Sequence, residues 1–424
     1  MYLTGSDAGN YSFITPGGLF ADINPGSQQI NLTAGWNIIS IGMSPTGSPL
    51  LIDILQPLID AGTLVKVIDD KGNTIENLGS DTWFESIGGL LATDGYQVKV
   101  SENTSLEVEG TPVQLPIDIP LVAGWNMISF PSLVAQNAME VFGQLIEGLF
   151  LQKVMDEKGR PLEELAGDWY NFIGNLEPGE GYKVKVSSAC TLTIRESYTK
   201  SLIHVPDLLA SDHFMPVYSG NGYDHMNLLI RDLEASGLKE GDELGIFDGD
   251  LCVGAVTIDH HSMWDNLISI PVSASDGLSE FANGFTEGNR LAIRIFRDGN
   301  ERRLTFEVEN GSTPVFTKGA TSALKITYSS VAVDVNPARV LSMTYYPNPF
   351  RDKLNIELET IPGTRITVGI VDVLGRKLSE FNIDKTTGHD LIQWQGIDAQ
   401  GVPVPAGTYM ILINGQHGGT IIRN

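Results

Sequence analysis

The feature that most constrains the fold of this chain is an internal repeat. The segment "LTAGWNIISIGMSP" at residues 32–45 returns as "LVAGWNMISFPS" at residues 121–132, so that Trp125 follows Trp36 by 89 residues. Three further anchors recur in the same order: "LVKVIDDKGN" as "LQKVMDEKGR", Trp83 as Trp169, and "DGYQVKV" as "EGYKVKV". This period is the length of a small domain, which predicts two tandem copies of one module.

Each copy is predicted to be mostly β-structure with one helical crossover. The runs "WNIIS", "LVKVID" and "YQVKVS" predict strands, and "DDKG" and "DEKG" predict hairpin turns. Between the first two strands of the second copy, "AMEVFGQLIEG" has apolar residues at helical spacing and ends at Gly148. The first copy has Pro57 in the matching segment, which predicts a short or kinked helix.

The repeated tryptophans allow two interpretations. Trp36 with Trp125, and Trp83 with Trp169, could stack against sugar rings or pack the small core of each copy. We favour the core, because tandem copies share their core residues whatever they bind.

From residue 201 the pattern changes to at least six β runs without further repeats. The pairs Asp248-Gly249, Asp298-Gly299 and Asn310-Gly311 are strong hairpin signals. Residues 201–332 are therefore predicted to form a β-sandwich.

Charge and composition limit the classes of partner. The formal net charge of −25 would repel nucleic acids and anionic lipid surfaces, so neither is an expected partner. No apolar run is long enough to cross a bilayer, and residues 1–13 are not a signal peptide. Cys190 and Cys252 lie in different predicted domains, which allows a disulfide without implying one.

No catalytic motif stands out, and the chain is predicted not to be an enzyme. A nucleophile elbow, a zinc-binding helix motif and a phosphate loop are all missing from the sequence. His260 and His261 are adjacent, and on a strand they would point to opposite faces, so we favour a solvated loop over a metal site there.

Two groups of residues are candidates for binding. The segment "EGDELGIFDGD" gathers four carboxylates around a turn, where they could bind calcium or simply face water: Asp242, Glu243, Asp248 and Asp250. Tyr218, Tyr223 and Trp264 could stack against a glycan on an exposed face of the sandwich. Apart from calcium, no cofactor is expected.

The last 80 residues carry the most specific pattern. "YYPNPFRDKLNIELET", "ITVGIVDVLGRKLSE" and "GHDLIQWQGIDAQGVPVPAGTYMILINGQHGGTIIRN" resemble the type A C-terminal sorting domain of the type IX secretion system of Bacteroidetes. The resemblance implies an Ig-like sandwich and export through the secretion machinery of the outer membrane to the surface or exterior. The anchors of this sorting motif fall on Pro347, Asn348, Pro349, Asp372, Leu374, Gly375, Arg376, Gly407, Tyr409, Ile422 and Arg423.

The start of the chain carries a weaker resemblance. "YLTGSDAGNYSF" is similar to the closing strands of Ig-like repeats in large bacterial adhesins, which implies that a longer protein precedes Met1. The predicted segments are a remnant repeat with linker (1–28), the two β-rich modules (29–112 and 113–200), the sandwich (201–332), a linker (333–343) and the sorting domain (344–424).

Three functions stay open at this stage. The first is a non-catalytic, adhesin-like surface protein that binds a glycan or a host or cell-surface protein. The second is the accessory, carbohydrate-binding region of a secreted hydrolase whose catalytic domain lies upstream. The third makes the sandwich itself a carbohydrate-binding module.

Overall fold

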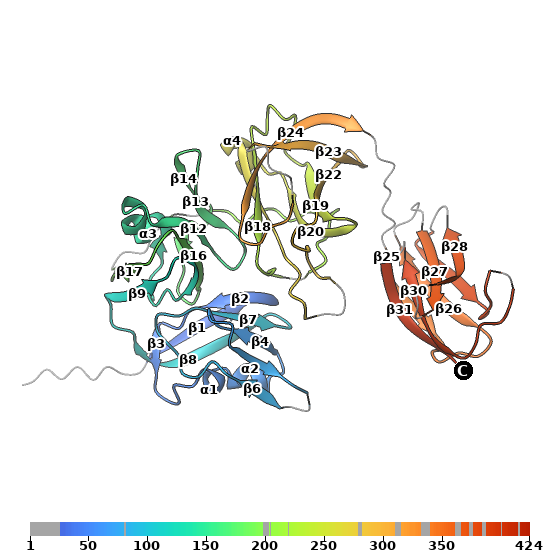
Figure 1. Cartoon of the computed structure of the whole chain (residues 1–424), viewed down its shortest axis with the longest axis horizontal. Helices are drawn as coiled ribbons and strands as arrows, with labels where there is room; N and C mark the ends of the chain where they lie inside the picture. The colour runs from blue at the N-terminus through green and yellow to red at the C-terminus, as the bar shows by residue number, and fades with distance from the viewer. Residues whose placement is uncertain are drawn as a thin grey trace, which may run out of the picture. The chain divides into compact units, whose positions relative to one another are not determined.

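The computed structural model describes residues 26–79, 82–197, 203, 205–218, 220–278, 282–309, 315–331, 340–360, 366–372, 376–383, 387–399, 401–413 and 416–424. It is mostly β-structure, as predicted (Figure 1). The chain divides into two compact units. Unit 1 comprises residues 1–298 and 303–330, and unit 2 comprises residues 299–302 and 331–424.

Module 1 is the first repeat copy. Its five-stranded sheet has the order β2-β7-β4-β5-β6, and a three-stranded sheet has the order β1-β8-β3. The strands are β1 (Gly26–Leu32), β2 (Gly35–Ile39), β3 (Met43–Pro45), β4 (Leu64–Ile68), β5 (Thr74–Asn77), β6 (Trp83–Glu85), β7 (Tyr96–Val100) and β8 (Thr104–Pro112).

Module 2 repeats this architecture. Its main sheet, β10-β16-β12-β13-β14, has the same connectivity as that of module 1, and two small sheets pair β17 with β9 and β11 with β15. The two repeat copies therefore share one strand order in their main sheets. The strands are β9 (Ile117–Leu121), β10 (Gly124–Ile128), β11 (Gln136–Asn137), β12 (Leu151–Met155), β13 (Pro161–Leu165), β14 (Asp168–Asn171), β15 (Asn175–Leu176), β16 (Tyr182–Val186) and β17 (Cys190–Ile194).

The helical crossovers also follow the prediction. In module 2 the crossover is α3 (Ala138–Glu147), whose N-cap Asn137 accepts a hydrogen bond from Met139 N and whose C-cap is Gly148. In module 1 the segment is broken into α1 (Leu51–Ile54) and α2 (Gln56–Asp60), with Pro57 in the first turn of α2. Proline lacks the N–H that a continuous helix would need there.

Module 3 follows module 2 along the chain and ends with β24, and its seven strands belong to one hydrogen-bonded sheet of order β20-β19-β22-β23-β24-β18-β21. Ser273 N donates to Val253 O at 2.9 Å, so the sheet curls until its edge strands meet around one apolar core. The elements are β18 (Met226–Arg231), β19 (Glu243–Asp248), β20 (Leu251–Thr257), α4 (His260–Asp265), β21 (Leu267–Val272), β22 (Leu291–Arg297), β23 (Asn300–Val308) and β24 (Thr321–Val331).

The predicted turns of module 3 are confirmed where they are described. Asp248-Gly249 joins β19 to β20, and Asp298-Gly299 joins β22 to β23. Asn310 and Gly311 lie outside the described residues. His260 and His261 begin α4 rather than lying in a loop, and both are exposed.

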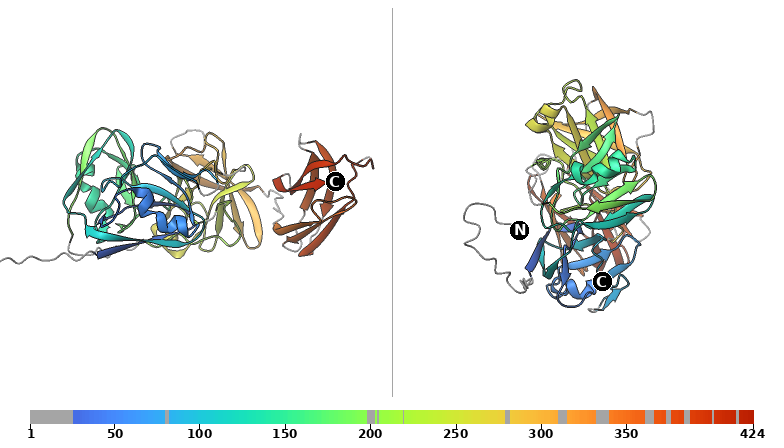
Figure 2. Two further views of the ribbon diagram at one scale, coloured as in Figure 1. Left: turned by 90° about the horizontal axis from the view of Figure 1, so that it is seen from below. Right: turned by 90° about the vertical axis from the view of Figure 1, so that its left-hand side faces the viewer.

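Unit 2 consists of two facing sheets, β25-β26-β29 and β28-β27-β30-β31, which enclose one core (Figure 2). Its first strand begins four residues before the predicted domain start at residue 344. The strands are β25 (Val340–Tyr346), β26 (Leu354–Thr360), β27 (Ile366–Asp372), β28 (Lys377–Ile383), β29 (His389–Trp394), β30 (Gly407–Ile413) and β31 (Gln416–Arg423).

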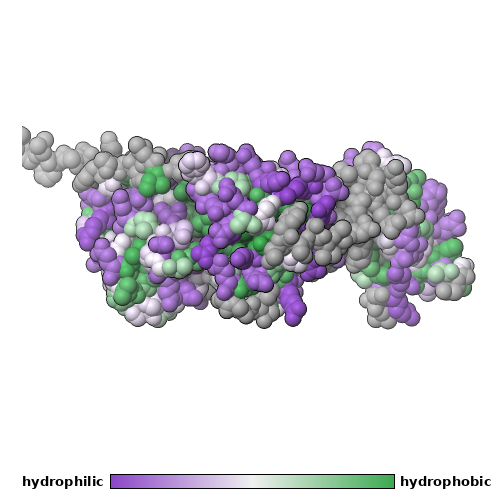
Figure 3. Space-filling view, turned by 90° about the horizontal axis from the view of Figure 1, so that it is seen from above, coloured by the Kyte–Doolittle hydropathy of each residue, from purple (hydrophilic) through white to green (hydrophobic). Residues whose placement is uncertain are grey.

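The surface of unit 1, the two cysteines and the helices were compared with what the composition predicts. Hydrophilic side chains cover much of the face of unit 1 seen in Figure 3. Cys190 and Cys252 form no disulfide. Within the described ranges, no helix has the length and apolar character that a membrane crossing requires.

Candidate binding site

The two repeat modules dock through matching contacts made in both directions. Asp70 of module 1 accepts a hydrogen bond from Met127 N of module 2 at 2.9 Å. Glu157, the equivalent of Asp70, accepts one from Ile38 N, the equivalent of Met127, at 3.2 Å. Exchanging the modules therefore reproduces the contact, and the interface has approximate two-fold symmetry.

Further paired contacts lie on and around this pseudo-two-fold axis. The equivalent hydroxyls Ser40 Oγ and Ser129 Oγ are hydrogen-bonded to each other at 2.6 Å. Gly95 and Gly181 are equivalent, and each donates its N–H to a backbone carbonyl of the other module. A Cβ at Gly95 would lie 2.5 Å from Ile128 O, so glycine is needed for this close approach.

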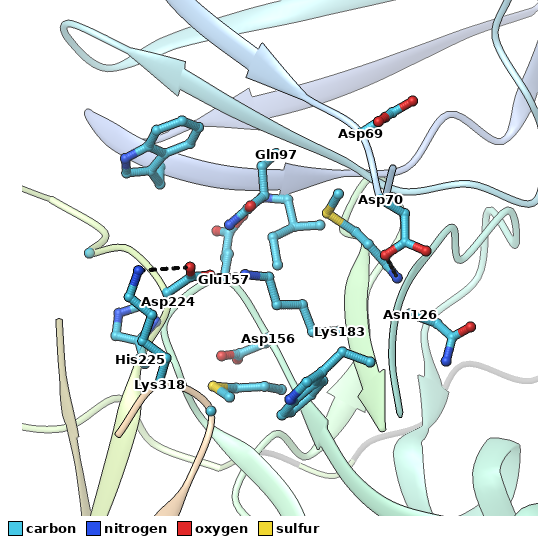
Figure 4. Close-up of a pocket in the computed structure, with 17 residues that line it drawn as sticks. Asp69, Asp70, Gln97, Asn126, Asp156, Glu157, Lys183, Asp224, His225 and Lys318 are labelled. Atoms are coloured by element: carbon cyan, nitrogen blue, oxygen red, sulfur yellow. Dashed lines mark hydrogen bonds and ion pairs between the residues drawn. The ribbon is translucent and has the colours of Figure 1, made fainter. Parts of the chain in front are cut away.

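A cavity of about 280 Å³ opens beside this interface (Figure 4). Equivalent residues of the two modules face each other across it, and loops of module 3 around residues 222–225 and 318–319 supply a third wall. The cavity therefore exists only because two copies of the module are docked. The main pairs are Trp36 with Trp125, Asp70 with Glu157, and Gln97 with Lys183.

Two of the cavity carboxylates, the equivalents Asp69 and Asp156, shape the hairpin turns. Asp69 Oδ1 accepts hydrogen bonds from the backbone N–H of Lys71 and of Asn73, at 2.9 and 2.8 Å. Asp156 accepts in the same way from Arg160 N, and it also pairs with the Arg160 side chain at 2.6 Å. Gly72 and Gly159 take the positive φ that these turns require.

Two other carboxyl groups are strongly perturbed. The pKa of Glu157 is raised to about 8, and burial is the main cause. The negative charges of Glu180 and Asp156 also raise this pKa, and each outweighs the hydrogen bond from Ile38 N, which lowers it. Burial, together with Asp156, raises the pKa of Glu180 to about 7. Glu157 also accepts a hydrogen bond from Asn221 Nδ2 at 3.2 Å. Because its pKa is about 8, Glu157 is protonated and uncharged at neutral pH, so this wall of the cavity presents a neutral carboxyl group.

Two lysines, Lys183 of module 2 and Lys318 of module 3, bring positive charge to the cavity. Lys183 pairs with Asp224, and Lys318 Nζ lies 3.7 Å from the same carboxylate (Figure 4). Burial by itself would raise the pKa of Asp224, but these lysines hold it below the usual value. Burial lowers the pKa of His225 to about 3, so this imidazole is neutral. The cavity thus presents both charge signs and neutral polar groups.

The two tryptophans of the GWN motif are placed differently from the favoured prediction. Trp83 and Trp169 do pack against the module cores, but Trp36 and Trp125 lie outside them, on the walls of the cavity. Trp36 is buried, and its Nε1 donates to Asp276 of module 3 at 3.0 Å. Trp125 is half-buried and faces the cavity. Module 3, rather than each module's own core, packs against these two rings, through Tyr223 at Trp36 and Gly319 at Trp125.

The aromatic residues proposed for module 3 do not share one face. Tyr218 and Tyr223 are half-buried and line a second cavity of about 210 Å³ between modules 1 and 3. The ring of Tyr223 lies 5.0 Å from that of Trp36. Trp264 is 82% exposed on α4, apart from both tyrosines. The expectation of a single exposed stacking surface is therefore wrong.

The four carboxylates considered for calcium have separate partners. Asp242 forms an ion pair with Arg297, and Asp250 Oδ1 lies 3.5 Å from Arg294. Glu243 accepts from Ser211 and from His213 N, and Asp248 accepts from Thr286 N and Asn289. Within the residues that the structure describes, no three His, Cys, Asp or Glu side chains are arranged to hold a metal ion.

In unit 2, residues of the sorting motif hold the terminal strand. Asn348 Oδ1 accepts from Ile422 N at 2.8 Å, and its Nδ2 donates to Thr420 O at 3.1 Å. Pro347 and Pro349 flank Asn348 in an exposed loop, which positions it opposite β31. Phe350 N then continues the pairing by donating to Ile422 O. The "PNP" segment thus fastens the last strand of the chain.

The remaining motif residues stabilise turns and the core. Asp372 accepts from Arg376 N and pairs with its side chain at 2.7 Å. Tyr409 is buried, and its hydroxyl donates to Pro405 O. Gly407 begins β30, and Arg423 ends β31. Leu374 and Gly375 lie outside the described residues.

Sequence reasoning missed most of the cavity residues. The repeated anchors, which predict only strands and turns, contain these residues: Asp70 in "LVKVIDD", Glu157 in "LQKVMDE", Gln97 in "GYQVKV" and Lys183 in "GYKVKV". The available signal was that these anchors keep polar residues at equivalent positions. Whether these polar residues face a cavity depends on how the modules dock, and the sequence does not show this docking.

Comparison with known proteins gives a clear result for one part of the chain. Residues 344–423 match the family described as "Secretion system C-terminal sorting domain". No curated protein matches the chain.

The solved structures that are similar to this chain include two of low sequence identity. Latent dimeric PorU from Porphyromonas gingivalis is 13% identical, with a TM-score of 0.19, and the match covers 86% of this chain and 30% of that one. The "BSP domain" of a biofilm-associated protein is 10% identical, with a TM-score of 0.13, over 97% and 98% of the two chains. The chain thus spans about a third of the length of the first structure.

Proposed function

We propose that this chain delivers unit 1 to the cell surface or the extracellular space as a non-catalytic binding unit. Its type IX secretion sorting domain at residues 344–423 directs this export. The observation that carries the proposal is the cavity on the pseudo-two-fold axis, with its two indole rings and its polar walls. Its function is adhesion or capture of a ligand that bears a small polar group.

The ligand class that suits this cavity best is a sugar unit of a glycan. Sugars present apolar C–H faces that stack on indole rings, and hydroxyls that bond to amide and carboxylate groups. Trp125 offers the ring, and Gln97 of module 1 and Lys183 of module 2 offer polar groups to the cavity. A volume of about 280 Å³ lies at the small end of ligand pockets, so one sugar unit fits better than a long chain segment.

The alternative setting is a secreted hydrolase. In that case the same cavity would hold substrate for a catalytic domain upstream of Met1, and the sequence preceding this chain distinguishes the two settings. The binding chemistry proposed for unit 1 is the same in both.

A glycan array tests the proposal. The full chain should bind a defined set of glycans, and Trp125→Ala should reduce this binding at least tenfold, because truncating a tryptophan at the centre of a binding site costs about 2 kcal/mol or more. Trp264→Ala removes an exposed indole outside the cavity and should bind as the wild type does. Binding to no glycan, or equal binding by Trp125→Ala and wild type, would overturn the proposal.

A further inference from the structure

A second polar cluster lies where module 2 meets module 3. Lys153 on β12 is the cross-strand partner of Glu163 on β13. Asn227 on β18 is the parallel-strand neighbour of Thr321 on β24. All four side chains converge, and Lys153, Glu163 and Asn227 are 4%, 5% and 0% exposed. A buried lysine with a carboxylate and a primary amide is an unusual combination for a structural contact.

The interatomic distances place the Lys153 amine next to the side-chain amide of Asn227. Lys153 Nζ lies 2.8 Å from Asn227 Oδ1, and Glu163 Oε2 lies 3.5 Å from the same nitrogen. Asn227 Nδ2 donates to Gly159 O at 2.7 Å, which fixes the amide with its oxygen toward the lysine. The amine, the carbonyl and a proton-accepting carboxylate are therefore held together by strands of two modules.

We infer that Lys153 and Asn227 form an intramolecular isopeptide bond that covalently joins module 2 to module 3, with Glu163 as the proton-transfer group. Nothing in the proposed binding function requires this bond, and the cavity on the pseudo-two-fold axis does not include the cluster.

The reaction balances without a cofactor or an oxidant. Glu163 accepts a proton from the Lys153 ammonium, and the neutral amine attacks Cγ of Asn227. The new C–N bond forms, Glu163 returns the proton to Nδ2, and the bond from Cγ to Nδ2 breaks. Glu163 then takes the second proton from the attacking nitrogen and passes it to the departing ammonia. The products are a secondary amide and one ammonia, which leaves as ammonium.

The surroundings favour each step. Burial lowers the pKa of Lys153 to about 8, which makes the neutral amine accessible near physiological pH. Thr321 Oγ1 donates to Glu163 and accepts from Lys153 at 2.6 Å, so it fixes the carboxylate beside the amine. Holding the reactants together replaces a bimolecular encounter and so removes a large entropic part of the barrier. The cluster borders an open cavity of about 470 Å³ through which ammonia can leave.

The repeat provides an internal control. Lys66 and Glu76 are the module 1 equivalents of Lys153 and Glu163, and they form an ion pair at 2.5 Å. No amide of module 3 reaches that pair: the partners of Lys66 Nζ and Glu76 in the described structure are each other and Thr74. The same two side chains without an asparagine should remain unreacted.

Intact-mass measurement of the full chain is the first test. The folded protein should be lighter than its sequence by one ammonia, and trypsin should release a branched peptide that joins residues 100–158 to residues 201–231, with no cleavage after Lys153. A mass equal to that of the sequence, with cleavage after Lys153, would overturn the inference. Loss of ammonia without the branched peptide, as a succinimide at Asn227 would give, would overturn it as well.

Variants then assign the roles. Lys153→Met and Asn227→Ala should each restore the full mass, and Glu163→Gln should block the reaction while conserving shape. Lys66→Met and Glu76→Gln should leave the branched peptide intact. Circular dichroism confirms that each variant is folded, and a branched peptide that persists in Glu163→Gln would exclude Glu163 as the proton-transfer group.

Discussion

The asparagine of the GWN motif offers the sharpest test of how each repeat module is built. Asn37 is 1% exposed, and its Oδ1 accepts from Thr33 N at 2.9 Å. Its Nδ2 donates to three backbone carbonyls, at 2.8 Å to Thr33 O, 3.3 Å to Gly35 O and 3.4 Å to Val98 O. One side chain therefore ties the turn before β2 to strand β7.

Asn126 makes the same four contacts in module 2. Its Oδ1 accepts from Val122 N at 2.8 Å, and its Nδ2 donates to Val122 O, Gly124 O and Val184 O at 2.9, 3.2 and 3.3 Å. Each short hydrogen bond contributes about 1 kcal/mol net, and each longer one contributes less. Replacement by alanine should therefore lower the free energy of unfolding of the affected module by about 2–4 kcal/mol.

The assay is urea unfolding of the full chain followed by tryptophan fluorescence, since Trp36 and Trp125 adjoin these asparagines. Asn37→Ala and Asn126→Ala should lower the midpoint of their transitions by similar amounts. Asn103→Ala is the matched control: it removes one exposed hydrogen bond, to Ala34 N, and should cost less than about 1 kcal/mol. Equal small effects for all three variants would refute the reasoning.

Three further predictions concern pH, docking and export. The pKa of Glu157 is about 8 in the folded chain against 4.5 unfolded, so the folded state keeps a proton that the unfolded state releases. The free energy of unfolding should therefore fall as pH rises between these values, by about 1.4 kcal/mol per unit of pKa shift. Thermal unfolding measured across this pH range checks this, and Glu157→Gln should flatten the dependence. Gly95→Ala should weaken docking of the modules and lower the melting temperature, whereas Gly143→Ala, where a Cβ meets nothing within 4 Å, should not; equal melting temperatures would contradict the close approach. Deleting residues 345–424 should leave the protein in the periplasm, and normal surface display of the deletion would contradict the role of the sorting domain.

The local structure was largely predictable from the sequence. Repeated anchors indicated two modules, helical spacing up to Gly148 indicated α3, and Pro57 indicated a broken helix. Each of these signals acts within a few residues of the chain. The sorting domain was recognised in the same way, and Asn348 shows why its motif is needed structurally.

The site was not predictable, because its residues are brought together by docking. Carboxylates such as Asp242 looked free in the sequence, but they meet arginines some 50 residues away. The sequence favours a core position for Trp36, because nothing in it shows that Tyr223 and Asp276 of module 3 contact this ring. Long-range partners of this kind are set by the tertiary structure.

The central claim is that duplication creates one shared binding site rather than one site in each repeat. Calorimetric titration of the full chain with the best ligand from the glycan array tests it directly. The account predicts one ligand per chain, with binding lost in Trp125→Ala and retained in Trp264→Ala. Two ligands per chain, or binding that survives Trp125→Ala, would contradict it.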